Sequence, residues 1–184
     1  MDSVSNHPIA SSSDKLNQMD TATDLLAKLQ STPAKTLLSY LDDVGQMGDA
    51  GYAALMLFLK ERVSPEVANS QSINPDDSNL YQPPDIAAGK AYQMLLNANQ
   101  PAYIEFLQTH YPTGVVPLRS QADIDYRPLQ TLLAKQHFQT ADQMTLQKLC
   151  EIAGENAVQR KWIYFTEVEQ LPSVDLQTLD ALWQ

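Results

Sequence analysis

Helix-length apolar segments, bounded by start and stop signals, constrain the fold of this chain more than any other feature. In "TADQMTLQKLCEIAG" (residues 140–154), apolar residues recur at helical spacing between a candidate N-cap, Thr140, and a stop at Gly154. The same periodicity recurs in residues 23–30, 32–45, 49–62, 85–98, 99–111, 125–138 and 175–184. Credible strand pairs are absent from the sequence, which therefore predicts an all-α protein.

Polar residues and prolines mark where these helices are expected to begin. Asp85 and Asp125 are candidate N-caps, and Pro101 is typical of a first helical position. "TEVE" at residues 166–169 matches a capping box, in which Glu169 would accept a hydrogen bond from the start of a short helix. The last helix is expected to start after Pro172.

Stretches without periodicity divide the chain. Residues 1–20 are Ser-rich and predict a disordered leader, and residues 64–85, with four prolines, predict a long loop inside an N-terminal helical bundle at 21–111. Residues 112–124 contain two prolines and a glycine and are expected to be a linker. A second helical domain then covers residues 125–184.

Composition excludes several classes of protein. With 22 acidic and 12 basic residues the net charge is -10, so the chain would repel a phosphate backbone and nucleic acid is not an expected partner. The one cysteine excludes an intramolecular disulfide framework and a multi-cysteine metal site. No stretch reaches the roughly 18 uninterrupted apolar residues of a membrane span. The expected location is the cytoplasm.

No group of residues matches a catalytic or metal-binding pattern. The histidines are His7, in the leader, and His110 and His137, at expected helix ends, where a histidine often complements the helix dipole. Cys150 lies among apolar helix positions, which favours a buried, inert thiol over a nucleophile. We therefore predict no catalytic residues, no metal ligands and no enzymatic activity.

The stretch "LCEIAGENAVQRKWIYF" (residues 149–165) combines an apolar helix, a polar segment expected to be a loop, two cations and an aromatic cluster. In one interpretation the aromatic residues 162–165 are core, and Arg160 and Lys161 form a solvated hinge. In the other, the stretch binds a flat, apolar, anionic ligand, and Arg160 or Lys161 meets its carboxylates. Covering on the order of 300 Å² of a macrocycle at ~25 cal/mol/Å² gives about 7 kcal/mol before ordering costs.

Two motifs, in order, resemble the genomes-uncoupled-four family. The first is "F-x-x-AD-x-x-T", from Phe138 to Thr145, and the second is "E-x-x-P-x-x-DL-x-T-x-D-x-LW", from Glu169 to Trp183. Upstream, "HYPTGVVPLRS-x-x-x-IDY" (residues 110–126) resembles the linker of the cyanobacterial members, which carry an N-terminal helical bundle. The resemblance covers most of residues 21–184.

The resemblance implies an all-helical protein that binds tetrapyrroles and stimulates magnesium chelatase in chlorophyll synthesis. The implied ligands are protoporphyrin IX and Mg-protoporphyrin IX, with no cofactor of the chain's own. The implied partner is the large porphyrin-binding subunit of the chelatase, and peripheral association with the thylakoid membrane is a further expectation.

Family binding residues transfer only to matching positions. Residues 154–161 would form a mobile flap over an apolar pocket, and Phe165 would lie at the pocket floor. Relatives often carry a basic residue at the position of Leu146, so one carboxylate partner is missing here. The candidate porphyrin contacts are Leu146, Leu149, Cys150, Ala153, Val158, Arg160, Lys161, Trp162 and Phe165.

The chain departs from the family pattern after Trp183. Family members continue with "SNG-x-FGFSVQ", further helices and a second aromatic, Arg-bearing loop, and none of these follows here. We therefore expect residues 125–184 to be the first half of a tetrapyrrole-binding domain, incomplete at its C-terminus. Leu179, Leu182 and Trp183 are expected to face helices that this chain does not contain.

Two other functions stay open on the residues alone. A helical protein-interaction module without a ligand would use the N-terminal bundle to dock a partner. An enzyme acting on tetrapyrroles is the weaker alternative, because no acid–base or metal group supports it.

Overall fold

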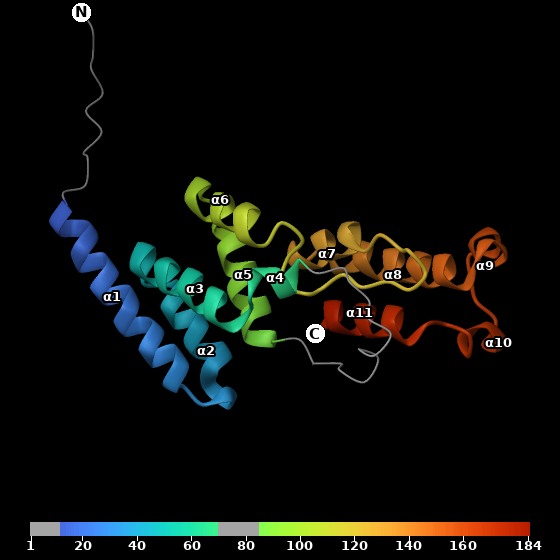
Figure 1. Ribbon diagram of the computed structural model, residues 1–184, viewed down its shortest axis with the longest axis horizontal. Helices are drawn as coiled ribbons and strands as arrows, with labels where there is room; N and C mark the ends of the chain where they lie inside the picture. Colours follow the sequence, from blue (N-terminus) through green and yellow to red (C-terminus); the bar gives the residue numbers. More distant parts are fainter. Residues whose placement is uncertain (1–11, 70–84) are drawn as a thin grey trace, which may run out of the picture. The chain divides into compact units, whose positions relative to one another are not determined.

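The computed structural model describes the backbone of residues 12–69 and 85–184, and all regular structure in these ranges is helical (Figure 1). The predicted all-α fold is confirmed. Within the described ranges no helix is both long and apolar enough to cross a membrane. The contacts of the described residues divide them into two compact units, one that ends at Phe58 and one that starts at Leu59.

The first unit contains α1 (Ser12–Ser31), α2 (Ala34–Gly45) and most of α3 (Gly48–Arg62). Because α1 begins at Ser12, the prediction of a disordered leader is wrong for residues 12–20, whereas residues 1–11 lie outside the described part of the chain. On α2, Leu37, Leu41 and Val44 recur at helical spacing, and all three are buried. One face of α2 therefore supplies core.

The α2–α3 connection brings the two helices into close approach. A Cβ at Gly51 of α3 would lie only 1.9 Å from the carbonyl oxygen of Val44 on α2. Glycine at this position lets the backbones meet, and it is followed on α3 by the buried Leu55 and Phe58.

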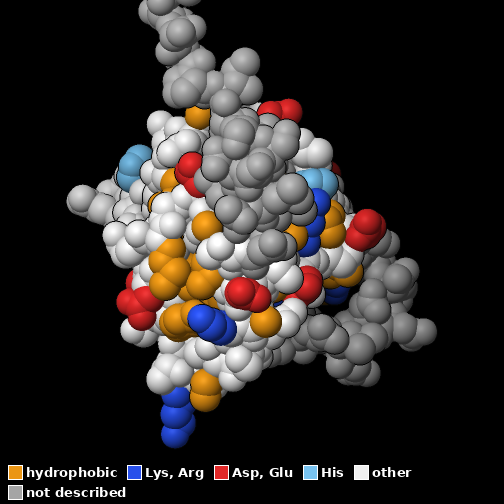
Figure 2. Space-filling model, turned by 90° about the vertical axis from the view of Figure 1, so that its left-hand side faces the viewer, with side chains coloured by type: hydrophobic (Ala, Val, Ile, Leu, Met, Phe, Trp, Pro, Cys, Tyr) orange, Lys and Arg blue, Asp and Glu red, His pale blue; other side chains and the backbone are white. Residues whose placement is uncertain are grey.

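On the face drawn in Figure 2, Lys and Arg side chains are scattered among acidic and hydrophobic ones.

In its described residues, the second unit holds the end of α3 and eight further helices. These are α4 (Pro65–Ala68), α5 (Ile86–Ala98), α6 (Pro101–His110), α7 (Arg127–Ala134), α8 (Phe138–Ala153), α9 (Glu155–Arg160), α10 (Phe165–Val168) and α11 (Ser173–Trp183). α5 packs against α6 and α7, α8 packs against α7 and α9, and α11 packs against α7. Residues 112–124, the expected linker, lie inside this unit. The predicted division into domains stays a prediction.

Helix starts agree with the sequence in some places and differ in others. Asp85 caps α5 by accepting hydrogen bonds from the amides of Ala87 at 3.0 Å and Ala88 at 3.2 Å, as predicted. Thr140 is not a cap, because α8 already begins at Phe138. Of the loop predicted at 64–85, residues 65–68 form α4 and residues 70–84 lie outside the described part.

The core of the second unit contains the last helix. Its buried members are Leu118, Tyr126, Leu129, Leu133, Ala141 and Leu179. Leu182 packs against this cluster, and the indole of Trp183 donates to Thr145 Oγ1 at 3.0 Å. The expectation that Leu179 faces missing helices is therefore wrong, because α11 packs against α7 and buries Leu179 in this core, whereas Leu182 is only partly buried against it.

Candidate functional site

A buried carboxylate holds α11 to the segment that precedes α7. Asp175, in the first turn of α11, is fully buried and accepts four hydrogen bonds from residues 120–126. Oδ1 accepts from the Ser120 hydroxyl and, at 2.9 Å, from the Tyr126 hydroxyl. Oδ2 accepts from the amides of Gln121 at 2.9 Å and Ala122 at 3.3 Å. We call Asp175 with these donors the Asp175 anchor.

A neighbouring hydrogen bond extends the contact made by the Asp175 anchor. One turn after Asp175, the Thr178 hydroxyl donates to the Arg119 carbonyl oxygen at 2.7 Å. Burial, followed by the hydrogen bond to Asp175, raises the pKa of Tyr126 far above its ordinary value. Tyr126 therefore stays a neutral donor to the carboxylate at every ordinary pH. The anchor is structural, since each of its groups is used within the protein.

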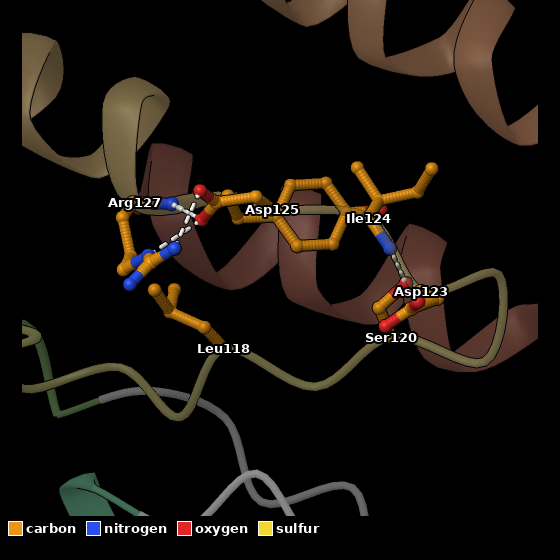
Figure 3. Close-up of a pocket in the computed structure, with 7 residues that line it drawn as sticks. Leu118, Ser120, Asp123, Ile124, Asp125 and Arg127 are labelled. Carbon is orange, nitrogen blue, oxygen red and sulfur yellow. Dashed lines mark hydrogen bonds and ion pairs between the residues drawn. The ribbon is translucent and has the colours of Figure 1, made fainter.

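A cavity of about 250 Å³ adjoins the anchor (Figure 3). It is lined by Leu118, Ser120, Asp123, Ile124, Asp125, Tyr126 and Arg127. Arg127 Nε donates to Asp125 Oδ1 at 2.8 Å, and this bond lowers the pKa of Asp125 to about 2. Small-molecule sites usually measure roughly 300–1,000 Å³ and are mostly apolar. This charged, smaller cavity does not suit a flat apolar ligand, and none of the nine candidate porphyrin contacts lines it.

The segment expected to be a polar loop is a helix. Gly154, at φ 107°, ends α8, and α9 starts immediately at Glu155. Glu155 in its first turn and Arg160 in its last complement the helix dipole, and Ala157 faces inward. The prediction of a loop at 154–161 is therefore wrong: "ENAVQR" has good helix formers but is too short to show an apolar period.

An ion pair joins the end of α9 to α10. Arg160 Nη2 donates to both carboxylate oxygens of Glu167, at 2.8 and 2.6 Å. Glu167 also accepts from the Tyr164 amide at 2.8 Å. That amide first and the guanidinium second lower the pKa of Glu167. The residue that bonds back to the start of α10 is therefore Glu167, and the capping role predicted for Glu169 is wrong.

Aromatic rings complete this ion-paired group. The Trp162 and Tyr164 rings meet edge to face, with centroids 4.3 Å apart. The guanidinium carbon of Arg160 lies 4.4 Å from the Tyr164 centroid and 5.3 Å from the Trp162 centroid, within cation–π range. We call Arg160, Trp162, Tyr164 and Glu167 together the α9–α10 brace.

The candidate porphyrin contacts fall into three environments. Cys150 is buried, as predicted, and its burial raises the pKa of the thiol. Leu149 packs against the core, and Ala153 and Arg160 are partly buried. Exposed side chains are those of Leu146, Val158, Lys161, Trp162 and Phe165. The structure thus brings Arg160 and Trp162 together in the brace and turns Leu149 and Cys150 toward the interior. Their role in ligand binding stays a prediction.

Large apolar side chains are unusually exposed along α9 and α10. Phe165 is 81% exposed, and Val158, Trp162, Tyr164 and Val168 are each exposed by more than two fifths. Proteins normally bury such side chains, so their concentration within residues 158–168 marks a surface suited to binding an apolar partner. We call it the α9–α10 surface.

The described residues contain no cluster of three or more His, Cys, Asp or Glu side chains that could hold a metal ion. Glu167 and Tyr164 are not predicted by the sequence as parts of the site. The capping-box pattern carried a signal for this region, but it was two residues out of register.

Together these features define a helical domain with an internal polar anchor and an exposed aromatic surface. Residues 119–184 match the family described as GUN4-like. After this match we call residues 119–184 the GUN4-like domain, and for these residues the predicted resemblance to the genomes-uncoupled-four family is confirmed.

Several known proteins have sequences similar to this chain. A Ycf53-like protein of Synechocystis is 40% identical over 164 residues, which are 89% of this chain and 64% of that protein. An uncharacterized protein ycf53 of Pyropia yezoensis is 44% identical over 95 residues, 52% of this chain and 40% of that protein. A chloroplastic tetrapyrrole-binding protein of Arabidopsis thaliana is 42% identical over 55 residues, 30% of this chain and 21% of that protein. The chain thus spans less than two thirds of each of these relatives.

Proposed function

We propose that this chain binds a porphyrin, protoporphyrin IX or Mg-protoporphyrin IX, on the α9–α10 surface. The observation that carries the proposal is the exposure of Phe165 and Trp162 beside two consecutive cations, Arg160 and Lys161. A tetrapyrrole offers a flat apolar face and carboxylates at its edge, which match rings and cations respectively. The GUN4-like match and the tetrapyrrole-binding relative in Arabidopsis thaliana support this ligand class.

The proposal extends to regulation. In it, the porphyrin-loaded chain stimulates magnesium chelatase through the large porphyrin-binding subunit of that enzyme, and itself catalyses no reaction. Peripheral association with the thylakoid membrane belongs to the same proposal. The family resemblance supports these statements. Addition of the chain to purified chelatase, with Mg-protoporphyrin formation as the readout, tests them: an unchanged rate over a range of porphyrin concentrations would count against the regulatory role.

Binding itself is tested by titration with protoporphyrin IX and tryptophan fluorescence. Both tryptophans, Trp162 and Trp183, lie in the GUN4-like domain, so Trp162→Phe and Trp183→Phe separate their signals. We expect saturable quenching that comes mainly from Trp162, because it lies on the α9–α10 surface. Quenching that never saturates, or that is unaffected by Trp162→Phe, would contradict the proposed site.

A matched pair of phenylalanines tests the location further. Phe165→Ser should weaken binding about tenfold, which corresponds to losing roughly 1.4 kcal/mol of apolar contact. Phe138→Ser is the control, because Phe138 is also exposed but begins α8, about 22 Å along the helix axis from Ala153 at its end. Equal losses in the two variants would show that binding is nonspecific.

A further inference from the structure

Arg160 and Lys161 are consecutive cations, but the structure gives them different surroundings. The Arg160 side chain is 25% exposed, binds both oxygens of Glu167 through Nη2 and lies over two aromatic rings. Its Nε is buried and has no hydrogen-bond partner among the described residues. The part of the guanidinium not used by Glu167 therefore includes an edge that solvent does not reach.

Lys161 is placed for the opposite role. It ends α9 in the left-handed conformation, at φ 64° and ψ 27°, and its side chain is exposed. In the described ranges it forms no ion pair with an acidic side chain. The next residue along the chain is Trp162, on the α9–α10 surface. Lys161 thus has hydrogen-bond donors available beside the proposed ring-binding surface.

The cost of recruiting each cation differs. A ligand carboxylate that bound Arg160 in place of Glu167 would exchange one carboxylate for another and would leave Glu167 without its guanidinium. The same carboxylate at Lys161 would add a charge-assisted hydrogen bond and break none. Rearrangement at Arg160 would also release the rings of Trp162 and Tyr164, which form the binding surface itself.

We propose that Lys161 recognises a porphyrin carboxylate, whereas Arg160 is a positioning residue that holds Trp162 and Tyr164 through its ion pair with Glu167. This inference rests on the proposed function. It predicts different roles for two consecutive residues of the same charge: Lys161 distinguishes porphyrin acids from their esters, and Arg160 does not.

The test compares protoporphyrin IX with its dimethyl ester, which keeps the macrocycle but lacks the carboxylate charges. Both are titrated into the full chain from the same cosolvent stock. Lys161→Gln should weaken binding of the acid about threefold to tenfold, the size of one partly exposed charged contact, and should leave the ester unchanged. Arg160→Gln should weaken acid and ester by the same factor. Lys135→Gln, which removes another exposed lysine, is the control and should change neither.

A ligand-free measurement tests the brace independently. In the Trp183→Phe background, Glu167→Gln should raise the acrylamide quenching constant of Trp162 and reduce the near-ultraviolet circular dichroism of the aromatic pair. Glu169→Gln is the matched control, because Glu169 is exposed and outside the brace. Equal behaviour of the two glutamate variants would overturn the positioning role of Arg160.

The outcomes separate this inference from the proposed function. If the unmodified chain binds neither porphyrin, the proposed function fails and the role of Lys161 fails with it. If the chain binds both but Arg160→Gln, rather than Lys161→Gln, removes the preference for the acid, the proposed function survives and only the present inference is overturned.

Discussion

Removal of the Asp175 carboxylate should destabilise the GUN4-like domain by an amount that follows from its four donors. Asp175→Ala leaves two backbone amides and two hydroxyls without their acceptor. The hydroxyls of Ser120 and Tyr126 can rotate toward other acceptors, but amides cannot. Each unsatisfied buried donor costs about 1–3 kcal/mol, and the exposure of Gln121 lets water reach one amide, so we expect a loss of about 2–4 kcal/mol in the free energy of unfolding.

Asp175→Asn should cost less, because its amide can match the same geometry. The amide oxygen can accept from the two backbone amides, and its NH2 group can donate to the two hydroxyls if they reverse. Only the charge is lost, and we expect about 1–2 kcal/mol, the difference between charged and neutral hydrogen bonds. We therefore also predict that Asp175→Ala lowers the free energy of unfolding more than Asp175→Asn does.

Urea unfolding followed by tryptophan fluorescence measures these losses. Both tryptophans lie in residues 119–184, so their emission reports this domain rather than the N-terminal unit. The control is Asp180→Asn, an exposed position on the same helix, which should stay within about 0.5 kcal/mol. If Asp175→Ala differs from this control by less than about 1 kcal/mol at an unchanged m-value, the anchor is not a stabilising element and the reasoning is refuted.

Two further predictions concern backbone packing and pH. Gly51→Ala should destabilise the N-terminal unit by about 1–3 kcal/mol, because the added Cβ would lie 1.9 Å from a backbone carbonyl oxygen. Gly89→Ala, whose Cβ would have no atom within 4 Å, should instead stabilise the protein by about 0.5–1 kcal/mol. Urea unfolding followed by far-ultraviolet circular dichroism measures both changes, and changes of the same sign in the free energy of unfolding would contradict the close packing at Gly51. Since the folded-state pKa of Asp125 lies near 2, below its ordinary value of 3.8, its contribution to stability is present above about pH 4 and is lost as the pH falls toward 2. Carboxyl-carbon NMR should show this low pKa in the unmodified chain and a return toward 3.8 in Arg127→Gln; a pKa unmoved by that substitution would exclude the ion pair as its cause.

The parts of the fold that sequence predicts are those set by local physics. Long amphipathic segments such as α2 and α8 show their period directly, because one face must be buried. Asp85 is identifiable as a cap because its partners are two and three residues away. α9 is missed because a six-residue helix with one buried residue, Ala157, has no period to detect.

Local sequence patterns do not predict the contacts that shape the candidate site. Asp175 lies 55 residues from Ser120, and no spacing rule connects them. Arg160 and Glu167 are seven residues apart, but the helix breaks between them, so helical periodicity does not predict their contact. The exposure of Phe165 is likewise unpredictable from composition, since most aromatic side chains are buried.

The motifs that carry the family resemblance have a structural role, whereas the residues expected to bind the ligand lie outside them. Within the two motifs, Thr145 bonds to Trp183, while Asp175 and Thr178 bond to residues 119–126. All the candidate porphyrin contacts lie between the motifs, in residues 146–165. The motif match therefore reports mainly how the domain is held together, and it carries information about the ligand only through the family. Substitutions in the Asp175 anchor should therefore lower the stability of the domain and leave the porphyrin affinity of the folded chain unchanged. Substitutions on the α9–α10 surface should lower the porphyrin affinity and leave the stability unchanged. Loss of porphyrin affinity in a fully folded Thr178→Val variant would break this separation.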